Sequence, residues 1–245
     1  MVAEIAVNGD SLTVVMPVYN ERAVVGVVVE EWCAALDALG IGYRWVVVDD
    51  GSTDGSAKAL AEAAARHPGK MEIVRQENAG HGSACRRGYE QAATGDAEWA
   101  LQIDSDGQCD PEFFAAFWKQ RAEYDCVFGR RTSRGDGLVR RVVSAVCAEA
   151  ASAMSGIAAG DVNVPYRLMR RSVLARALQS VPAEFELQNV ALTVALRRQP
   201  GIRFGWEPIH FRARADGKSG MKLWAIVRLG WTMVRQRKGL RGREE

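Results

Sequence analysis

The chain has 245 residues, of which 48% are hydrophobic, 25% charged and 8% aromatic. These proportions are those of an ordinary folded domain, so they exclude disordered, collagen-like and coiled-coil chains. The net charge of +2 is unevenly distributed, because Arg212–Glu245 carries a net +7 and the preceding residues a net −5. This asymmetry points to a polyanionic or membrane-surface partner for the basic tail.

Three features favour a reduced compartment and no membrane span. The chain has no uninterrupted run of about 18 apolar residues, which a spanning helix needs. Its N-terminus, MVAEIAVNGD, lacks the basic and apolar parts of a secretory signal. The five cysteines are odd in number and form no CxxC pair, which disfavours a disulfide framework and a zinc site. We therefore expect a cytoplasmic protein.

The first half of the chain alternates between short β-branched runs and segments of helical length. Strands are predicted at Leu12–Pro17, Trp45–Asp50, Met71–Arg75 and Trp99–Ile103. Helices are predicted at Ala23–Leu39, Ser56–His67, His81–Ala93 and Pro111–Tyr124. This alternation predicts an α/β fold built from βαβ units, with a largely parallel, Rossmann-like sheet flanked by helices.

The second half is less regular. Further strands are predicted at Cys126–Gly129, Pro165–Met169 and Ile202–Ile209, with a loop at Arg130–Gly137. Helices are predicted at Val139–Ser155, Ser172–Ser180 and Leu187–Arg198. Because no low-complexity linker interrupts the chain, these elements predict one domain with a C-terminal appendage.

Three polar clusters follow predicted strands, at Tyr19–Glu21, Asp49–Asp54 and Asp104–Gln108. In a parallel sheet, ligands bind in the crevice beyond the carboxyl ends of the strands. The third cluster places Asp104 and Asp106 one residue apart directly after WALQI. Two hard oxygen ligands beside a diphosphate suit Mg²⁺ or Mn²⁺. The alternative is a polar turn, but the position at a strand end favours the metal.

The second cluster, DDGSTDGS, has two interpretations. Asp54 or Ser56 can cap the following helix, while a carboxylate at the strand end can accept hydrogen bonds from a ribose or a base. The segment Asn78–Ala84 begins a helix with two glycines, so its backbone can approach a ligand closely. Neither a GxGxxG after the first strand nor a P-loop is present.

Four motifs together carry a family resemblance: VVMPVYNE (Val14–Glu21), VVVDDGSTDGS (Val46–Ser56), ENAGHGSACRRG (Glu77–Gly88) and LQIDSDGQCDP (Leu101–Pro111). They resemble family 2 glycosyltransferases of the GT-A fold. Gln108, DVNVPYRLMRR (Asp161–Arg171) and ARADGKS (Ala213–Ser219) are similar to the dolichol-phosphate mannosyltransferase and polyprenyl-phosphate glycosyltransferase group. The resemblance covers about Ser11–Ser219.

The resemblance implies a domain over residues 1–219. Residues 11–110 would bind the nucleotide sugar and residues 111–219 would bind the acceptor. The residue pattern, and not the resemblance, predicts a basic amphipathic helix and tail over residues 220–245. Pro17, Tyr19 and Glu21 would border the nucleobase, and Asp50 would bind the base or ribose.

The same resemblance implies a metal and diphosphate site made by Asp104, Asp106 and Gln108. Phosphates of donor or acceptor would lie near Arg131, Arg214 and Ser219. The implied reaction is a metal-dependent, inverting transfer of a hexose from GDP-mannose or a UDP-sugar to a polyprenyl phosphate at the cytoplasmic membrane face. The metal, Mg²⁺ or Mn²⁺, would offset charge on the leaving diphosphate, with Asp106 and Arg131 in catalytic positions.

A polyprenyl phosphate is already an anion, so it needs cations and no general base. Clustered arginines in the acceptor half can supply that charge or simply form a solvated face; they are Arg130, Arg131, Arg134, Arg140 and Arg141. A hydroxyl of a soluble natural product or saccharide would instead need a carboxylate base. Asp161 is the first candidate for that base, ahead of Glu184 and Glu186, although all three can be turn or helix-start residues.

A third hypothesis is a non-catalytic protein that binds a nucleotide sugar, against which the intact Asp50, Asp104 and Asp106 argue. His81 and His210 are interpreted as structural, because nothing supplies metal-ligand spacing around them. No nucleic-acid-binding motif accompanies the basic tail, so nucleic acid is excluded as a partner.

The tail has an amphipathic pattern. Apolar residues recur at helical spacing at Leu223, Ile226, Val227, Trp231 and Val234, while Arg228, Arg235 and Lys238 lie on another face. Such a helix suits the interface of an anionic membrane, here the inner face of the plasma membrane. The alternative is a helix that packs its apolar stripe on the domain.

Overall fold

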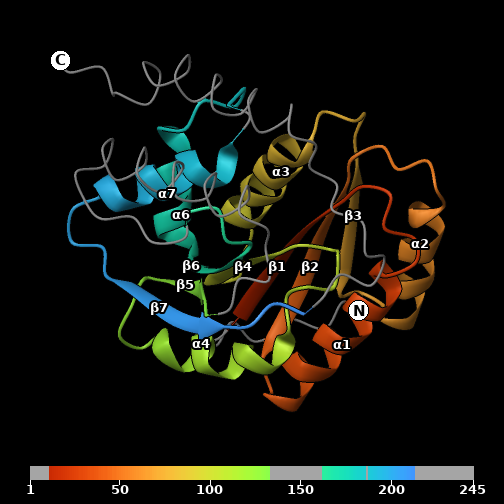
Figure 1. Ribbon diagram of the computed structural model, residues 1–245, viewed down its shortest axis with the longest axis horizontal. Coiled ribbons are helices and arrows are strands. Elements are labelled where there is room, and N and C mark those ends of the chain that lie inside the picture. The colour runs from red at the N-terminus through yellow and green to blue at the C-terminus, as the bar shows by residue number, and fades with distance from the viewer. Residues whose placement is uncertain (1–10, 133–161, 186, 213–245) are drawn as a thin grey trace.

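The computed structural model describes residues 11–132, 162–185 and 187–212. These residues form one seven-stranded sheet with helices on both faces (Figure 1). The strands are β1 (Ser11–Val18), β2 (Gly42–Asp49), β3 (Met71–Arg75), β4 (Trp99–Ile103), β5 (Cys126–Arg131), β6 (Tyr166–Arg170) and β7 (Phe204–Ile209). Their order in the sheet is β3-β2-β1-β4-β6-β5-β7.

The sheet is mixed but mostly parallel. β6 runs antiparallel to both of its neighbours, β4 and β5, and the other neighbouring strands are parallel. β1, β2 and β4 lie side by side in the middle, and β1 and β4 are buried almost throughout. Near-continuous β-branched and aliphatic runs such as LTVVMPV are expected of strands covered on both faces.

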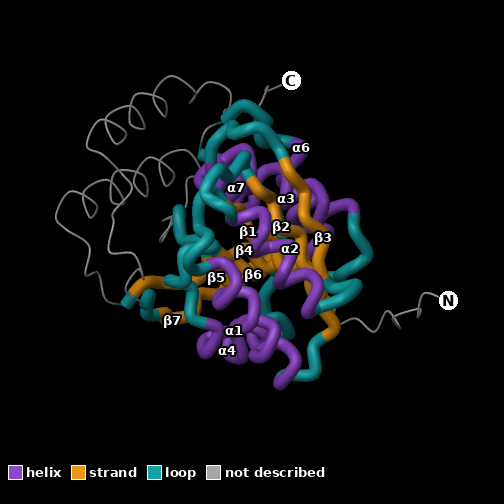
Figure 2. Tube along the Cα trace, turned by 90° about the vertical axis from the view of Figure 1, so that its right-hand side faces the viewer, coloured by secondary structure: helices purple, strands orange, loops and turns teal. Residues whose placement is uncertain are grey.

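Two groups of helices cover the sheet. They are α1 (Val25–Ala38), α2 (Ser56–Arg66), α3 (His81–Thr94), α4 (Phe114–Gln120), α6 (Arg171–Gln179) and α7 (Gln188–Arg198). Figure 2 shows α3, α6 and α7 on one side of the strands and α1 and α4 on the other, and α2 packs beside α1. None of the helices within the described residues has the length and apolarity to cross a membrane.

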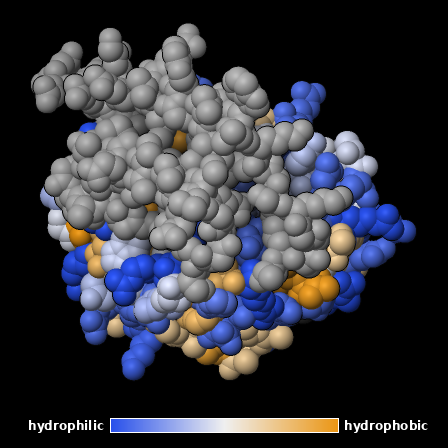
Figure 3. All heavy atoms as spheres, in the orientation of Figure 1, coloured by the Kyte–Doolittle hydropathy of each residue, from blue (hydrophilic) through white to orange (hydrophobic). Residues whose placement is uncertain are grey.

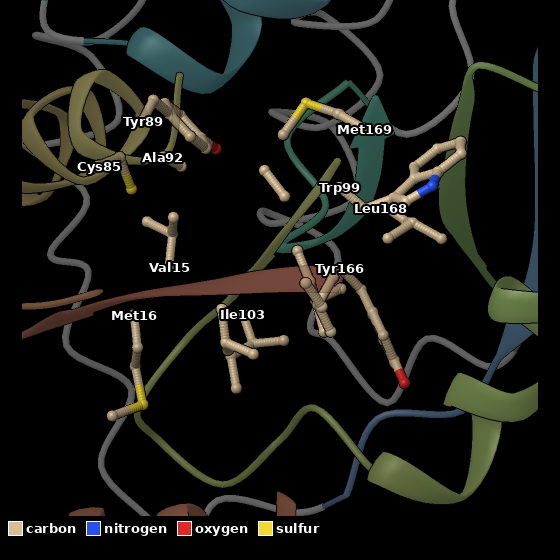
Figure 4. Close-up of a cluster of buried hydrophobic side chains, with 14 of the residues drawn as sticks. Val15, Met16, Cys85, Tyr89, Ala92, Trp99, Ile103, Tyr166, Leu168 and Met169 are labelled. Atoms are coloured by element: carbon tan, nitrogen blue, oxygen red, sulfur yellow. The ribbon is translucent and has the colours of Figure 1, made fainter. Parts of the chain in front are cut away.

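The core fills both faces of the central strands. Figure 4 shows Val15 of β1 pointing toward Cys85 and Tyr89 of α3, while the next residue, Met16, points to the opposite face. All four side chains are fully buried. The alternation follows from the period of two along a strand. At the outer surface, the described part of the face in Figure 3 is mostly hydrophilic, with small scattered apolar patches.

The predicted α/β fold is confirmed for the described residues, with local differences. β5 continues through Arg131, where a loop was predicted from Arg130, because Arg130 and Arg131 pair with Pro208 and Ile209 of β7. The helix predicted at Pro111–Tyr124 divides into a 3₁₀ turn at Pro111–Phe113 and α4, which ends at Gln120. The helices predicted at Val139–Ser155 and in the tail lie outside the described residues.

Candidate active site

The sheet topology gathers the predicted polar clusters at one edge. β2, β1 and β4 are parallel neighbours, so the residues that follow Val18, Asp49 and Ile103 emerge together. β6 is antiparallel and begins at this edge, where Tyr166 pairs with Ile103. The register of β5 and β7 brings their carboxyl ends, Arg131 and Ile209, to the same side. The edge therefore joins the predicted donor and acceptor halves.

Hydrogen bonds join the cluster at Tyr19–Glu21 to the segment at the end of β2 and the start of α2. The backbone amide of Asn20 donates to Ser52 Oγ (3.0 Å), and the amide of Thr53 donates to Asn20 Oδ1 (2.8 Å). The amide of Glu21 donates to Ser56 Oγ at 2.8 Å. Asn20 has a φ of +56°, in the left-handed region that Asn tolerates better than most residues. The predicted base-binding residue Tyr19 stands beside this turn, 49% exposed.

Asp50 lies beneath the edge and is almost fully buried. Its Oδ1 accepts hydrogen bonds from Gln76 Nε2 (2.7 Å) and the amide of Ala79 (2.9 Å). Its Oδ2 accepts from the amide of Gly80 at 2.9 Å. The carboxylate thus fixes the glycine-containing segment that begins α3. The family resemblance assigned Asp50 to the base or ribose; the contacts present in the structure are with Gln76, Ala79 and Gly80, and they give Asp50 a structural role at the candidate site.

Asp104 follows β4, and both of its side-chain contacts are made by one carboxylate oxygen, Oδ1. Gln102 Nε2 donates to Asp104 Oδ1 at 3.0 Å, and His81 Nε2 lies 3.1 Å from the same oxygen. Within the described residues, no hydrogen bond reaches Oδ2 of Asp104, which leaves that oxygen for a metal. The electrostatic effects of the Cys85 sulfur and then of Asp104 raise the pKa of His81 well above its ordinary value.

His81 lies at the candidate site, a position that sequence reasoning did not predict. It was interpreted as structural, yet its side chain is 56% exposed and contacts the first carboxylate of the DxD sequence. The available signal was its position as the first residue of α3, directly after Gly80. Helix N-termini are favourable places for anionic ligands, so a polar side chain there has a higher chance of facing a ligand.

Asp106 and Gln108 complete the predicted metal site. The amide of Gln108 donates to Asp106 Oδ1 at 3.0 Å, and Asp106 is 9% exposed. Gln108 Nε2 donates to the carbonyl of Arg212 at 3.2 Å, which accounts for the amide nitrogen, so Gln108 Oε1 is the atom that would bind a metal. Mg²⁺ and Mn²⁺ take one or two carboxylates and complete their shell with substrate phosphates. These donors therefore fit such an ion.

A resident ion held by protein alone is a poorer fit. Among residues 11–132, 162–185 and 187–212, no group of three or more His, Cys, Asp or Glu side chains is arranged to hold a metal. Two carboxylates and an amide oxygen would leave most of an octahedral shell open. A diphosphate of the expected donor would supply the missing ligands, so binding of the metal would depend on binding of the donor.

The loop that carries Asp104, Asp106 and Gln108 is anchored to the rest of the chain. Arg212, after β7, donates to both carboxylate oxygens of Asp110 (2.6 and 2.8 Å) and to Glu31 Oε2 (2.5 Å). These carboxylates raise the pKa of Arg212. Burial, and then the charge of Asp104, raise the pKa of Cys109 well above its ordinary value, so its thiol stays protonated and donates to the carbonyl of Pro165.

The acceptor-side predictions are placed in part. Arg131 lies at the end of β5, with its guanidinium carbon 4.6 Å from the centre of the Phe211 ring. Glu184 is exposed in the segment before α7. The remaining acceptor-side residues lie outside the described residues: Arg134, Arg140, Arg141, Asp161, Glu186, Arg214 and Ser219.

The family model for Glycosyl transferase family 2 matches residues 13–178. The chain belongs to this family. The match spans the sheet edge and both aspartates of the DxD sequence, and it confirms the resemblance drawn from the sequence motifs. Family 2 proteins are glycosyltransferases, the enzyme class to which this chain is assigned.

Curated relatives share the family and carry names that specify a lipid acceptor. Undecaprenyl-phosphate 4-deoxy-4-formamido-L-arabinose transferase of Proteus mirabilis (strain HI4320) is 32% identical over 190 residues, which are 77% of this chain and 57% of that protein. The protein of the same name from Pseudomonas paraeruginosa (strain DSM 24068 / PA7) is 34% identical over 167 residues, which are 67% of this chain and 48% of that protein. This chain spans about half the length of these relatives.

Solved structures confirm that the fold is GT-A-like. Glucosyl-3-phosphoglycerate synthase from Mycobacterium tuberculosis superposes with a TM-score of 0.67 at 18% identity, covering 94% of this chain and 81% of that one. The structure of that enzyme with Mn²⁺, UDP-glucose and phosphoglyceric acid superposes with a TM-score of 0.66 at 18% identity. The match covers 94% of this chain and 80% of that one. Mannosyl-3-phosphoglycerate synthase from Rubrobacter xylanophilus superposes with a TM-score of 0.65 at 17% identity. The match covers 96% of this chain and 77% of that one.

Proposed function

We propose that this protein transfers a sugar, with inversion, from a nucleoside-diphosphate donor to a polyprenyl phosphate in a reaction that requires Mg²⁺ or Mn²⁺. The observation that carries the proposal is the pair Asp104 and Asp106 at the end of β4, together with Gln108, at the edge where all the predicted donor clusters meet. The relatives named for undecaprenyl phosphate support the acceptor class.

Each residue has a defined part in this proposal. A divalent ion bound by Asp104, Asp106 and Gln108 would supply positive charge to the leaving diphosphate. Pro17, Tyr19, Glu21 and Asp50 would border the base and ribose. Arg131, Arg214 and Ser219 would bind phosphate oxygens, for which arginine has a suitable fork of N–H donors.

The acceptor determines whether a base is needed. A phosphate oxygen is anionic at neutral pH and can attack the anomeric carbon without losing a proton, so Asp161 would have no catalytic role. With a hydroxyl acceptor, a carboxylate within hydrogen-bond reach would have to take the proton. Loss of the carboxylate in Asp161→Asn therefore separates these two acceptor classes.

A donor-by-acceptor screen tests the proposal. UDP- and GDP-hexoses and a UDP-linked 4-formamido-arabinose would be combined with undecaprenyl phosphate or with soluble hydroxyl acceptors, in Mn²⁺ or Mg²⁺. We expect product with undecaprenyl phosphate that disappears on chelation and falls at least about 100-fold in Asp106→Asn, because that variant removes a charged metal ligand.

The matched control is Asp37→Asn. Asp37 forms an exposed ion pair with Lys70 near the end of α1, so this change removes a carboxylate without touching the site. Product formed only with a hydroxyl acceptor would contradict the proposed acceptor, and full activity of Asp106→Asn in chelator would contradict the metal assignment. Donor binding without transfer to any acceptor would favour the non-catalytic binding protein.

A further inference from the structure

A row of buried polar side chains lies directly beneath the metal site. It begins at Asp104 and passes through Gln102 of β4 to Tyr89 of α3 and Asn189 of α7. Tyr89 Oη donates to Asn189 Oδ1 at 2.6 Å and lies 3.3 Å from Gln102 Oε1. Tyr89 and Gln102 are fully buried and Asn189 is 5% exposed. Figure 4 shows Tyr89 extending from α3 over the sheet.

The row fixes which end of the Gln102 amide faces Asp104. Gln102 Oε1 accepts from Asn189 Nδ2 (3.5 Å) and lies near Tyr89 Oη, whose single hydrogen is donated to Asn189 Oδ1. Gln102 Nε2 must then point the other way, toward Asp104 Oδ1. The reversed amide would place oxygen against a carboxylate oxygen of Asp104 and nitrogen against the N–H donor of Asn189, leaving both contacts unsatisfied. The carboxylate of Asp104, which only accepts, and the N–H of Asn189 therefore select this orientation, and Tyr89 holds Asn189 in place through its hydroxyl.

The same row reaches the acceptor half through Arg167, which is fully buried on β6. Arg167 Nη1 donates to the carbonyl of Asn189 at 2.8 Å. Its Nη2 and Nε donate to the carbonyls of Val162 and Val164, both at 2.6 Å. Val162–Val164 leads into β6 at the site edge, so one set of buried hydrogen bonds holds this segment and the DxD carboxylate.

We propose that Tyr89, Gln102 and Asn189 are positioning residues that fix the Asp104 carboxylate, and that Arg167 extends this support to Val162–Val164. Oδ1 of Asp104 is held by Gln102 and His81, so Oδ2 is presented to the metal–diphosphate in a constant direction. Groups that orient metal ligands affect metal affinity although they never touch the ion. This inference rests on the proposed function, because Asp104 acts as a metal ligand only there.

The test is Tyr89→Phe, which removes one buried hydroxyl and leaves the ring in the core. Binding of Mn²⁺ in the presence of UDP would be measured by electron paramagnetic resonance on the full chain, beside steady-state kinetics. We expect the Kd for Mn²⁺ to rise about 10-fold, as is typical when a partner of a metal ligand is lost. The KM for the donor should rise with it. Gln102→Met, which keeps the side-chain length but removes the N–H donor, should have the same effect.

The matched control is Tyr43→Phe. Tyr43 is also buried and its hydroxyl is hydrogen-bonded to Lys70, but it lies at the start of β2, at the opposite end of that strand from the site. Its Kd for Mn²⁺ should equal that of the wild type. Lower melting temperatures of Tyr89→Phe and Gln102→Met with unchanged Mn²⁺ affinity would overturn the inference, since they indicate a purely structural role. If Tyr89→Phe fails to fold, Gln102→Met decides by the same criterion.

The proposed function and the positioning inference are contradicted by different measurements, the first on the wild type and the second on the variants. A wild-type protein that binds no Mn²⁺ in the presence of UDP overturns the proposed function, and the positioning inference with it. A wild type that binds Mn²⁺ and transfers sugar, beside variants with wild-type Mn²⁺ affinity, overturns the positioning inference alone.

Discussion

Asp50 joins two segments of the site through a single buried carboxylate. It accepts hydrogen bonds from the side chain of Gln76 and from the amides of Ala79 and Gly80. A carboxylate can accept on both oxygens at once, whereas an amide accepts on one and donates on the other. The start of α3 therefore depends on an acidic residue at this position whether or not the nucleotide also contacts it.

Asp50→Asn tests this dependence. The new NH₂ group would face at least one N–H donor, so we expect the free energy of unfolding to fall by about 1–3 kcal/mol, the cost of leaving buried polar groups unpaired. Urea denaturation measures this change. Asp96→Asn, at an exposed carboxylate, should change it by less than about 0.5 kcal/mol. Equal stability of the two variants would contradict the structural role of Asp50.

At the scale of elements, α3 connects the candidate donor site to the core. Its first residue, His81, contacts Asp104, while Tyr89 belongs to the buried polar row. Between them, Gly88 lies against β1, where an added Cβ would come within 2.4 Å of Val15 Cγ1. Because α3 packs this closely on β1, the contact at Gly88 determines where the start of α3 lies relative to the edge of the sheet.

Gly88→Ala should therefore destabilise the protein although alanine is the better helix former. The overlap with Val15 forces α3 or the valine to shift, which costs about 1–3 kcal/mol, more than the roughly 1 kcal/mol gained in helix propensity. Thermal or chemical denaturation gives the net effect, and UDP binding should weaken if α3 moves.

The control is Gly26→Ala in α1, where an added Cβ meets nothing within 4 Å. Here only the propensity and chain-entropy gain of alanine remains, so stability should be unchanged or rise by up to about 1 kcal/mol. A Gly88→Ala protein as stable as Gly26→Ala would show that the contact between α3 and β1 is not tight.

The periodicity of the sequence predicted these elements well, because β-branched runs and helix-length segments are local signals. The strand at Trp99–Ile103 was predicted with the bounds that the structure has. The end of β5 was missed because it depends on pairing with β7, about 75 residues further along the chain, which no local pattern encodes. Gly51–Asp54 was predictable in part. The sequence indicated a polar turn there, but it did not indicate the hydrogen bonds that the turn makes with Asn20 and Arg22.

The site was predictable where it sits at strand ends and not where distant side chains complete it. Asp104 and Asp106 follow a strand, and the rule for parallel sheets predicted their position at the carboxyl end of β4, which the structure confirms. Arg212 and Asn189 contribute through contacts made across roughly 100 residues of chain, to Asp110 and Tyr89. Such contacts follow from packing of the complete sheet and its helices.

At the scale of the whole molecule, charge is divided between two regions. The sheet edge is rich in carboxylates, and residues 212–245 carry a net +7. A donor diphosphate and its metal would bind at the acidic edge, while a polyprenyl phosphate resides in a membrane whose surface is anionic. A basic tail suits the second requirement, because an anionic membrane attracts clustered Lys and Arg.

The full chain with Arg228→Gln, Arg235→Gln and Lys238→Gln tests whether the tail binds membranes. Each basic residue contributes about 1 kcal/mol near an anionic surface, so three neutralised charges should weaken binding to phosphatidylglycerol vesicles about 100-fold. Vesicle co-sedimentation at low salt measures the partition coefficient, with neutral phosphatidylcholine vesicles as the reference. The unfolding midpoint should stay constant, since the apolar stripe is intact. Unchanged vesicle binding with a lower unfolding midpoint would instead indicate that these residues pack the tail against the domain, leaving the lipid acceptor to be recognised without it.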